Sequence, residues 1–297
     1  MPSKDPSAGT LWTIIKALEW TAGYFRQLGI AQPRAVAEIL LAHVLGCTRI
    51  DLYLRYDQPL NDQERSSYKE LIRRRAGFEP EAYIVGSKEF WSLTLHVASD
   101  VLIPRPETEC VVEAVLDHLP AHEGVHLLEL GTGSGAISIA LAHERPHWRF
   151  RASDISERAI AMAQANASRL VPSAAIEFCV GRWFEVIDGT AVQFDVIVSN
   201  PPYIPSGQVA RLQREISDFE PRQALDGGPE GLDCLTHIIE IAPIHLKPKG
   251  WLILEMGHDQ QAQVEAIARR SRAYDRIEFR KDYSGYPRVT QLRRRPA

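Results

Sequence analysis

The tetrapeptide Asn200-Pro201-Pro202-Tyr203 is the segment of this sequence whose residue types most directly suggest chemistry. Two prolines after an asparagine form a rigid turn whose carbonyl groups cannot all be satisfied within the chain. The side-chain oxygen of Asn200 and the backbone carbonyl of Pro201 can each accept one N–H bond of a planar –NH2 group, and Tyr203 can supply an aromatic wall. The pattern therefore predicts that this turn positions a weakly nucleophilic nitrogen for reaction.

A glycine-rich segment, Glu129-Leu130-Gly131-Thr132-Gly133-Ser134-Gly135, could bind the molecule that reacts with this nitrogen. Glycines let the backbone turn tightly and approach a ligand, and the start of the following helix attracts an anion. Such loops serve NAD, FAD and S-adenosylmethionine, so the segment alone indicates a nucleotide-like cofactor, with tight strand–helix packing as the alternative. Its candidate contacts are Gly131, Thr132, Gly133, Ser134 and Gly135.

Two later residues could complete a cofactor site. Asp154 ends the next apolar run, about 23 residues after Gly131, where a carboxylate can accept both hydroxyl groups of a ribose. The alternative is that Asp154 caps the helix that follows. Trp183 follows the third apolar run and could stack on adenine or pack in the core. The order of these residues along the chain favours the binding roles.

A sulfonium methyl group would complete the chemistry, because the sulfonium is a good leaving group and the nitrogen needs mainly alignment and desolvation. Hydrogen bonds from the –NH2 group to Asn200 and Pro201 that strengthen as the nitrogen becomes positive would stabilise the transition state selectively. The sequence shows no obvious general base, so we expect the proton to leave to solvent after methyl transfer.

The elements that must position these residues follow from the pattern after residue 124. Apolar runs alternate with helical patterns, which predicts an α/β fold with a parallel, doubly wound sheet. The expected strands are 125–130, 148–153, 175–180, 194–199 and 251–255, with two more at 276–280 and 288–292. The expected intervening helices are 135–143, 157–170, 232–245 and 260–270.

The first part of the chain has a helical pattern instead. Apolar residues recur at helical spacing in 11–22 and 33–46, and a further helix is expected at 61–75. Residues 90–97 alternate as in a hairpin, and Pro106 is expected to begin a helix that ends near 119. The predicted organisation is a helical recognition domain at 1–78, a β-hairpin linker at 79–104 and a catalytic domain at 105–297.

Composition excludes several classes of protein. The 297 residues carry a formal net charge of −4, which excludes a protein held on nucleic acid by bulk charge. Four widely spaced cysteines, no apolar leader and no membrane-length apolar run predict a cytoplasmic protein without disulfides. His118, His122 and His126 recur every four residues, but Pro120 and Gly124 interrupt any helix, so no metal site is expected.

The arginine runs at 73–75 and 293–295 have two interpretations. The first is that they are solvated ends of a helix and of the chain, since cations favour the last turn of a helix. The alternative is that they help to dock a macromolecular partner.

These motifs together resemble the class I S-adenosylmethionine-dependent methyltransferases that act on planar –NH2 groups. They are most similar to the peptide chain release factor glutamine methyltransferase family. Residues 102–109, Leu-Ile-Pro-Arg-Pro-Glu-Thr-Glu, resemble the family's signature before the cofactor domain, and 129–135 and 200–203 match its two site motifs. Phe-Glu-Pro at 219–221 and Ala-Leu-Asp-Gly-Gly at 224–228 resemble its post-site loop. The resemblance spans nearly the whole chain.

The resemblance implies a mostly parallel seven-stranded sheet and S-adenosylmethionine as cofactor. The net charge and the lack of a membrane-length apolar run predict no direct contact with nucleic acid or membrane. The implied substrate is the glutamine of the Gly-Gly-Gln motif in class I peptide chain release factors, gripped elsewhere by the N-terminal domain. The residues that would hold the cofactor are Gly131 to Gly135, Asp154, Trp183 and Asn200. Asn200, Pro201, Pro202 and Tyr203 would be the catalytic residues around the glutamine amide.

Two further motif segments have less definite implied roles. Glu220 is expected to support the site loop rather than to react. Residues 102–107 could line the glutamine slot or pack between domains.

Other functions fit parts of the same pattern. A ribosomal-protein glutamine methyltransferase would use the same site motifs. A nucleic-acid amino-methyltransferase would present an exocyclic –NH2 group to the same turn, but it needs a basic groove and an aromatic platform. A non-catalytic nucleotide-binding module would bind cofactor without turnover.

Arg182 departs from the family pattern, in which an acidic residue often precedes the stacking tryptophan and can accept a bond from the adenine amino group. Arginine has donors only, so backbone or water would read the adenine edge. We predict that Arg182→Asp retains activity and does not weaken cofactor binding measured by calorimetry. A large loss of affinity would show that Arg182 makes a needed contact.

Overall fold

The structure is a computed structural model that describes residues 11–121, 124–187 and 192–296. Its internal contacts divide the chain into two compact units, Met1–Gly86 and Ser87–Ala297, which are described separately. Among the described residues, no helix has the length and apolar character needed to cross a membrane.

The first unit is helical, as predicted. Its helices are α1 (Ile14–Gln27), α2 (Pro33–Leu45), α3 (Arg49–Leu54), α4 (Asp62–Ala76) and α5 (Glu81–Val85). The expected patterns correspond to α1, α2 and α4. Helices α3 and α5 were not predicted, because elements of six and five residues are too short to show a hydrophobic period.

One core holds the first unit together. Leu18 of α1, Leu40 of α2 and Ile72 of α4 are buried in it, and Ile84 of α5 belongs to the same cluster. The compact division therefore follows Gly86, after α5, and the β-hairpin falls in the second unit.

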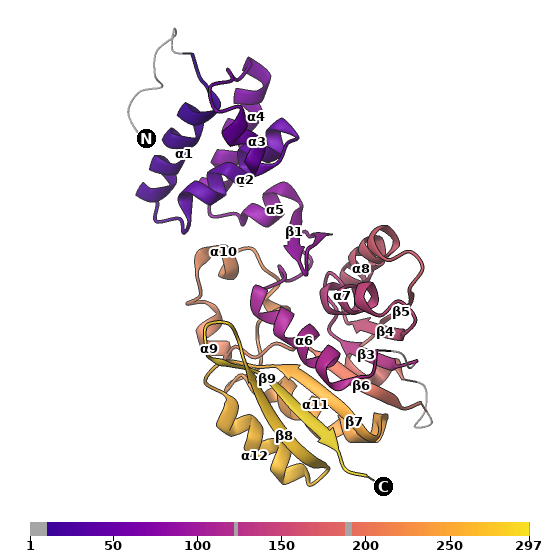
Figure 1. The fold of residues 1–297 in the computed structure, drawn as a ribbon. Coiled ribbons are helices and arrows are strands. Elements are labelled where there is room, and N and C mark those ends of the chain that lie inside the picture. The colour runs from indigo at the N-terminus through magenta and orange to yellow at the C-terminus, as the bar shows by residue number, and fades with distance from the viewer. Residues whose placement is uncertain (1–10, 122–123, 188–191, 297) are drawn as a thin grey trace. The chain divides into compact units, whose positions relative to one another are not determined.

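The second unit contains the predicted doubly wound, mostly parallel seven-stranded sheet (Figure 1). Its order is β5-β4-β3-β6-β7-β9-β8, and β9 is antiparallel to both of its neighbours. The strands are β3 (His126–Leu130), β4 (Arg149–Asp154), β5 (Ala175–Val180), β6 (Phe194–Ser199), β7 (Leu246–Glu255), β8 (Tyr274–Lys281) and β9 (Pro287–Arg294).

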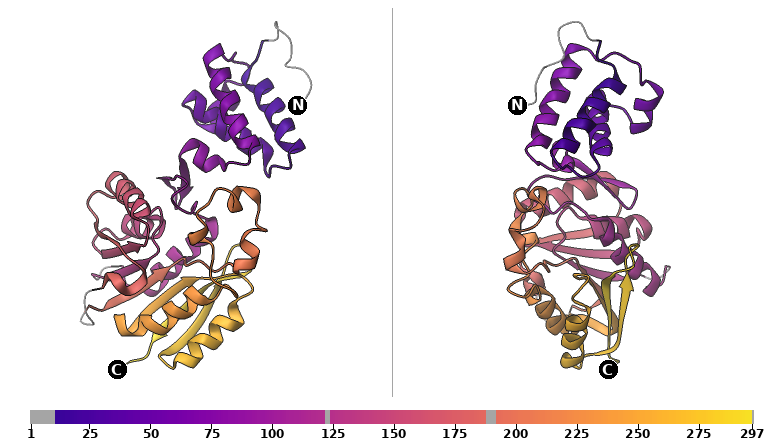
Figure 2. Two further views of the ribbon diagram at one scale, coloured as in Figure 1. Left: turned by 180° about the vertical axis from the view of Figure 1, so that it is seen from behind. Right: turned by 90° about the vertical axis from the view of Figure 1, so that its left-hand side faces the viewer.

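Both faces of this sheet are apolar and covered. Along β3, Leu127 belongs to one buried cluster while Leu128 and Leu130 belong to the other, which is the alternation expected of a strand. Helices α6 (Glu109–His118), α7 (Ala136–Glu144) and α8 (Glu157–Leu170) supply residues to the first cluster, and α11 (Asp233–His245) and α12 (Gln261–Ser271) to the second. Figure 2 shows this unit from two further sides, with helices on both faces of the sheet.

Two expected boundaries were wrong. Strand β7 begins at Leu246 rather than at 251, because Pro248 and Gly250 interrupt the strand pattern in its first part. Its pairing with β6 is irregular in the same part. The predicted hairpin is present as β1 (Ser87–Phe90) and β2 (Leu93–His96), so its first strand begins before residue 90. Trp91 and Ser92 form its turn with φ of 53° and 57°, values that non-glycine residues rarely adopt.

Shorter helical turns connect these elements around one edge of the sheet. They are η1 (Pro106–Thr108), η2 (Trp183–Val186), α9 (Ser206–Val209), α10 (Arg214–Ser217) and η3 (Arg222–Ala224). Strands β3, β4, β5 and β6 run parallel, so the segments that follow them meet at this edge. The chain winds outward in opposite directions from β3 and β6, which creates the crevice where doubly wound sheets bind ligands.

Candidate functional site

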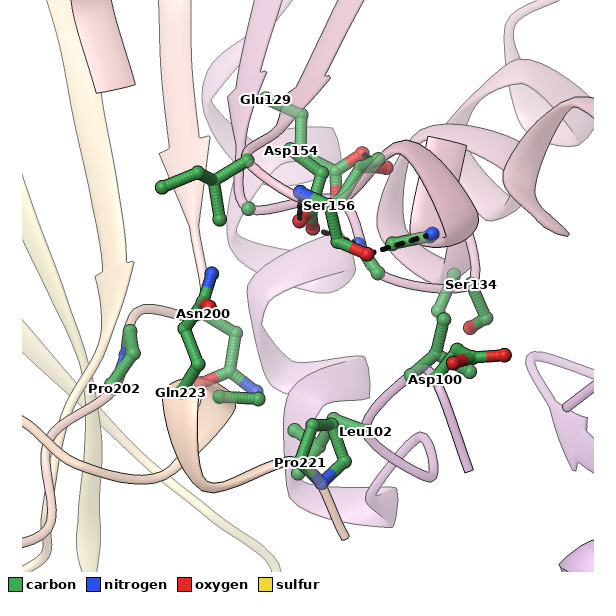
Figure 3. Close-up of a pocket in the computed structure, with 18 of the residues that line it drawn as sticks. Asp100, Leu102, Glu129, Ser134, Asp154, Ser156, Asn200, Pro202, Pro221 and Gln223 are labelled. Atoms are coloured by element: carbon green, nitrogen blue, oxygen red, sulfur yellow. Dashed lines mark hydrogen bonds between the residues drawn. The ribbon is translucent and has the colours of Figure 1, made fainter. Parts of the chain in front are cut away.

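A cavity of about 480 Å³ lies in this crevice, within the second unit (Figure 3). It is in the size range of small-molecule sites. The residues expected from the sequence that line it are Gly131, Thr132, Gly133, Ser134, Asp154, Trp183, Asn200 and Pro202. The other three expected residues, Gly135, Pro201 and Tyr203, do not line the cavity. The structure therefore brings together most of the residues that the sequence singled out.

The glycine loop after β3 has a shape that requires its glycines. Gly131, Gly133 and Gly135 all have positive φ. A β-carbon on Gly135 would lie 2.7 Å from Cδ1 of Ile139 and 3.2 Å from Cβ of Ala163, so this glycine also lets α7 pack closely against α8. Both observations explain why the loop and the helix after it need this residue type.

Asn166 of α8 forms hydrogen bonds that fix the glycine loop, and this role was not predicted from the sequence. Its fully buried side chain donates from Nδ2 to the carbonyl oxygens of Ser134 and His96, both at 2.9 Å. Its Oδ1 accepts from the backbone N–H of His96 at 2.8 Å. The glycine loop and the end of the hairpin are thus joined through one amide.

Asp154 at the end of β4 connects two loops. Its Oδ2 accepts from the N–H of Gly133 and its Oδ1 from the N–H of Ser156, both at 2.9 Å. Ser156 caps α8 by accepting from the N–H of Ala159, so Asp154 is not the cap of that helix. Because each carboxylate oxygen can accept more than one hydrogen bond, Asp154 keeps acceptor capacity for a ligand in the cavity.

Glu129 is a cavity residue that sequence analysis did not select, although it begins the glycine segment. Its Oε2 accepts from Oγ1 of Thr132 at 2.7 Å, from the N–H of Ser138 at 3.1 Å and from the Ser138 hydroxyl. Burial raises the pKa of this carboxyl to about 7, against the opposing effect of these bonds. All three bonds are on Oε2, so Oε1 is the oxygen left for a ligand.

Asn200 at the end of β6 reaches a second buried carboxylate through a threonine. Its Nδ2 donates to Oγ1 of Thr108 at 3.1 Å, and that hydroxyl donates to Oε2 of Glu255 at 2.6 Å. The Tyr203 hydroxyl donates to Oε1 of Glu255 at 2.9 Å. Tyr203 is thereby tied to the end of β7.

The turn at 200–203 is tied to the loop at 225–231. The N–H of Gly227 donates to the carbonyl of Ile204 at 2.9 Å, and Nε2 of Gln260 donates to the carbonyls of Tyr203 and Gly231 at 2.9 and 3.0 Å. A β-carbon on Gly227 would lie 2.7 Å from the Pro202 oxygen and 2.8 Å from Cα of Tyr203. The loop can approach the turn because this position has no side chain.

The remaining wall of the cavity comes from the segment 102–109 and from the loop that begins at 219, two of the segments on which the family resemblance rests. Leu102 and Pro104 line the cavity together with Pro221 and Gln223. In Figure 3, Gln223 lies beside Asn200 and Pro221 lies beside Leu102. Glu220 accepts from the guanidinium of Arg105 and, at 3.4 Å, from the N–H of Ile103. Burial raises the pKa of Glu220 while Arg105 opposes the rise. Glu220 therefore ties the two segments together.

The histidines and arginine runs singled out from the sequence include residues that contact other side chains outside the cavity. His118 stacks on Trp251 with ring centroids 3.8 Å apart, and His122 lies outside the described residues. No group of metal-ligating side chains occurs in the described part of the chain. In the arginine runs, Arg73 pairs with Glu70 at 2.6 Å and Arg293 with Asp275 at 2.7 Å.

Comparisons with known proteins agree with this architecture. The family description "PrmC N-terminal domain" matches residues 16–86, and "Methyltransferase small domain" matches residues 109–217. A methyltransferase structure from Pyrococcus furiosus has a TM-score of 0.50 and 21% identity, and the match covers 69% of this chain and 90% of that one. This likeness concerns the fold.

Two curated relatives are similar over most of their length. The release factor glutamine methyltransferase of Geobacter sulfurreducens is 42% identical over 88% of this chain and 90% of that protein. The protein of the same name from Salmonella typhimurium is 44% identical over 87% of this chain and 91% of its own.

The fold and these matches define a methyltransferase of the doubly wound class. Within that class, the chain belongs to the release factor glutamine methyltransferase family.

The contact between Gly227 and the turn can be tested by adding one methyl group. In Gly227→Ala the β-carbon would meet three backbone atoms, so we expect the free energy of unfolding to fall by about 1–3 kcal/mol. The matched control is Gly207→Ala, whose β-carbon has no neighbour within 4 Å and which should change it by less than about 0.5 kcal/mol. Equal denaturation midpoints for both variants would contradict the packing described here.

Proposed function

We propose that this protein transfers the methyl group of S-adenosylmethionine to the side-chain amide nitrogen of the glutamine in the Gly-Gly-Gln motif of class I peptide chain release factors. The observation that carries the proposal is that one cavity is lined both by the glycine loop with Asp154 and Trp183 and by Asn200 and Pro202 of the Asn-Pro-Pro-Tyr turn. Cofactor groups and amide-binding groups thus face the same space. Membership of the family supports the choice of substrate.

The residues present suit S-adenosylmethionine. Asp154 has an oxygen beside each of two fixed N–H groups and can accept from ribose hydroxyls. The ring of Trp183 closes over the glycine loop, since a β-carbon on Gly131 would lie 3.9 Å from its Cζ3. Ile155 is half exposed and lines the same space, so both offer apolar surface to a base. Oε1 of Glu129 can accept from the ammonium group of the cofactor.

When bound, S-adenosylmethionine supplies an electrophilic methyl group on a good leaving group. The chain's own residues then have to orient the glutamine amide and exclude water from it. Oδ1 of Asn200 and the carbonyl of Pro201 accept the two N–H bonds of that amide. These bonds strengthen as the nitrogen gains positive charge, so they stabilise the transition state more than the ground state. The proton leaves to solvent after transfer.

The two units divide the work in this proposal. The helical unit, which contains the segment matched by the family description, grips the release factor away from its Gly-Gly-Gln loop. The second unit performs the transfer. No basic groove is required for a protein substrate.

The proposal is tested by incubating the purified chain with a class I release factor and S-adenosylmethionine carrying a labelled methyl group. Peptide mass spectrometry should find one added methyl group on the Gly-Gly-Gln glutamine. Asn200→Ala is the matched variant, and it should nearly abolish turnover while cofactor affinity in calorimetry changes by less than about tenfold, or roughly 1.4 kcal/mol.

Label in a ribosomal protein or in nucleic acid, with none in the release factor, would contradict the proposed substrate. Cofactor binding without any methyl transfer would indicate a non-catalytic nucleotide-binding module and would contradict the proposed activity. Equal losses of turnover and of cofactor affinity in Asn200→Ala would place Asn200 in the cofactor site rather than beside the glutamine.

Glu129 predicts a pH effect on cofactor binding. Its pKa of about 7 in the free protein means that the carboxyl is largely protonated at about pH 6, and a bound ammonium group favours the charged form. At pH 6 the Glu129 carboxyl should lose its proton when the cofactor binds, so the wild type should release up to about one proton more than Glu129→Gln. Above about pH 8 the carboxyl is already ionised, and the difference between the two proteins should vanish. Calorimetry in buffers of different ionisation enthalpy measures it, and equal release at pH 6 would contradict the role of Glu129.

A further inference from the structure

The amide of Asn200 can be placed in its site in two ways that differ little in shape. One presents Oδ1 to the cavity and the other presents the Nδ2 group, because the two ends of a side-chain amide are nearly isosteric. A substrate –NH2 group has only donors to offer here. The two placements are therefore opposite in function, and the transfer described above requires the one with the oxygen in the cavity.

We infer that Thr108 is a positioning residue which, together with Glu255, holds the Asn200 amide with its oxygen toward the cavity. This inference rests on the proposed function, since it concerns how the same site receives a glutamine amide. Thr108 lies just before α6 and Glu255 ends β7, so neither belongs to the Asn-Pro-Pro-Tyr turn.

The direction of the hydrogen bonds follows from the chemistry of the groups. A carboxylate only accepts, and the Tyr203 hydroxyl already donates to Oε1 of Glu255. The Thr108 hydroxyl has a single proton and donates it to Oε2 at 2.6 Å. Its oxygen then has only lone pairs left for Asn200. Nδ2 of Asn200, 3.1 Å away, can donate to these lone pairs, whereas a reversed amide would place its oxygen against them.

Burial makes this direction costly to reverse. Glu255 is 0% exposed and Thr108 is 4% exposed, so water has little access to replace a lost bond. Burial raises the pKa of Glu255, and the bonds from Thr108 and Tyr203 together with the charge of Arg288 oppose the rise. The charged carboxylate is the form that accepts from both hydroxyls at once. Buried polar groups in such a chain polarise one another and specify one arrangement.

Two substitutions at Thr108 separate its hydroxyl group from its shape. Thr108→Val keeps the branched shape and removes the hydroxyl, and Thr108→Ser keeps the hydroxyl. With release factor as substrate, kcat should fall roughly 10- to 100-fold in Thr108→Val, with KM for S-adenosylmethionine within about twofold, and Thr108→Ser should restore kcat to within about threefold. Wild-type kcat in Thr108→Val, or equal losses in both variants, would overturn the inference.

Thr290→Val is the matched control. Thr290 of β9 is also fully buried and pairs with Leu254, next to Glu255 in sequence. Its hydroxyl has no hydrogen-bond partner among the residues that the structure describes. Removing that hydroxyl should leave kcat and KM at wild-type values. A loss of kcat equal to that of Thr108→Val would show that any buried hydroxyl near β7 matters, which would also overturn the inference.

A measurement that does not depend on turnover keeps the inference testable if Thr108→Val fails to fold. In the wild-type protein with labelled asparagine, the Nδ2 protons of Asn200 should show a nuclear Overhauser effect to the methyl group of Thr108, with Asn200→Ala assigning the signals. Its absence would overturn the inference. A wild-type protein that shows this contact but does not methylate the release factor would support the orientation and refute the proposed substrate.

Discussion

Hydrogen bonds to two buried carboxylates shape the edge of the sheet on which the site depends. Glu129 lies near the end of β3 and lines the cavity, and Glu255 ends β7; they are 1% and 0% exposed, and burial raises the pKa of each. A buried carboxylate without partners is costly, so the surrounding loops must bring donors to it. Thr132 and Ser138 do so for Glu129, and Thr108 and Tyr203 for Glu255.

These requirements explain why the two halves of the cavity have their particular forms. Thr132 of the glycine loop and Ser138 of the first turn of α7 both donate to Glu129, so the loop is held against the helix. Asp154 fixes the same loop by accepting from Gly133. Donors to Glu255 hold the start of α6 and the Asn-Pro-Pro-Tyr turn together. One carboxylate thus supports the proposed cofactor side, and the other supports the proposed amide side. The parallel sheet places both at the same edge.

Much of the second unit could be predicted from sequence because its central strands are buried on both faces. Such strands appear as continuous apolar runs, as in β3 and β6, and the residues after them carry the site motifs. Short helices such as α3 carry no period, and Pro248 and Gly250 disguise the first part of β7. These local limits explain the errors in the boundaries.

The supporting contacts could not be predicted for a different reason. Thr108 and Glu255 are 147 residues apart in sequence, and Asn166 reaches a loop 32 residues before it. Hydrogen bonds between such distant residues leave no periodic or local signature. Position in the glycine segment was a usable signal for Glu129, whereas Thr108 had only its place in the stretch 102–109.

The central claim is that one cavity holds the cofactor and a glutamine amide with the oxygen of Asn200 facing that amide. A crystal structure of the protein with S-adenosylhomocysteine and a Gly-Gly-Gln peptide tests it most directly. We expect ribose hydroxyls at Asp154 and the glutamine Nε2 within hydrogen-bond distance of Asn200 Oδ1 and the Pro201 carbonyl. A glutamine bound elsewhere, or an Asn200 whose Nδ2 points away from Thr108, would contradict it.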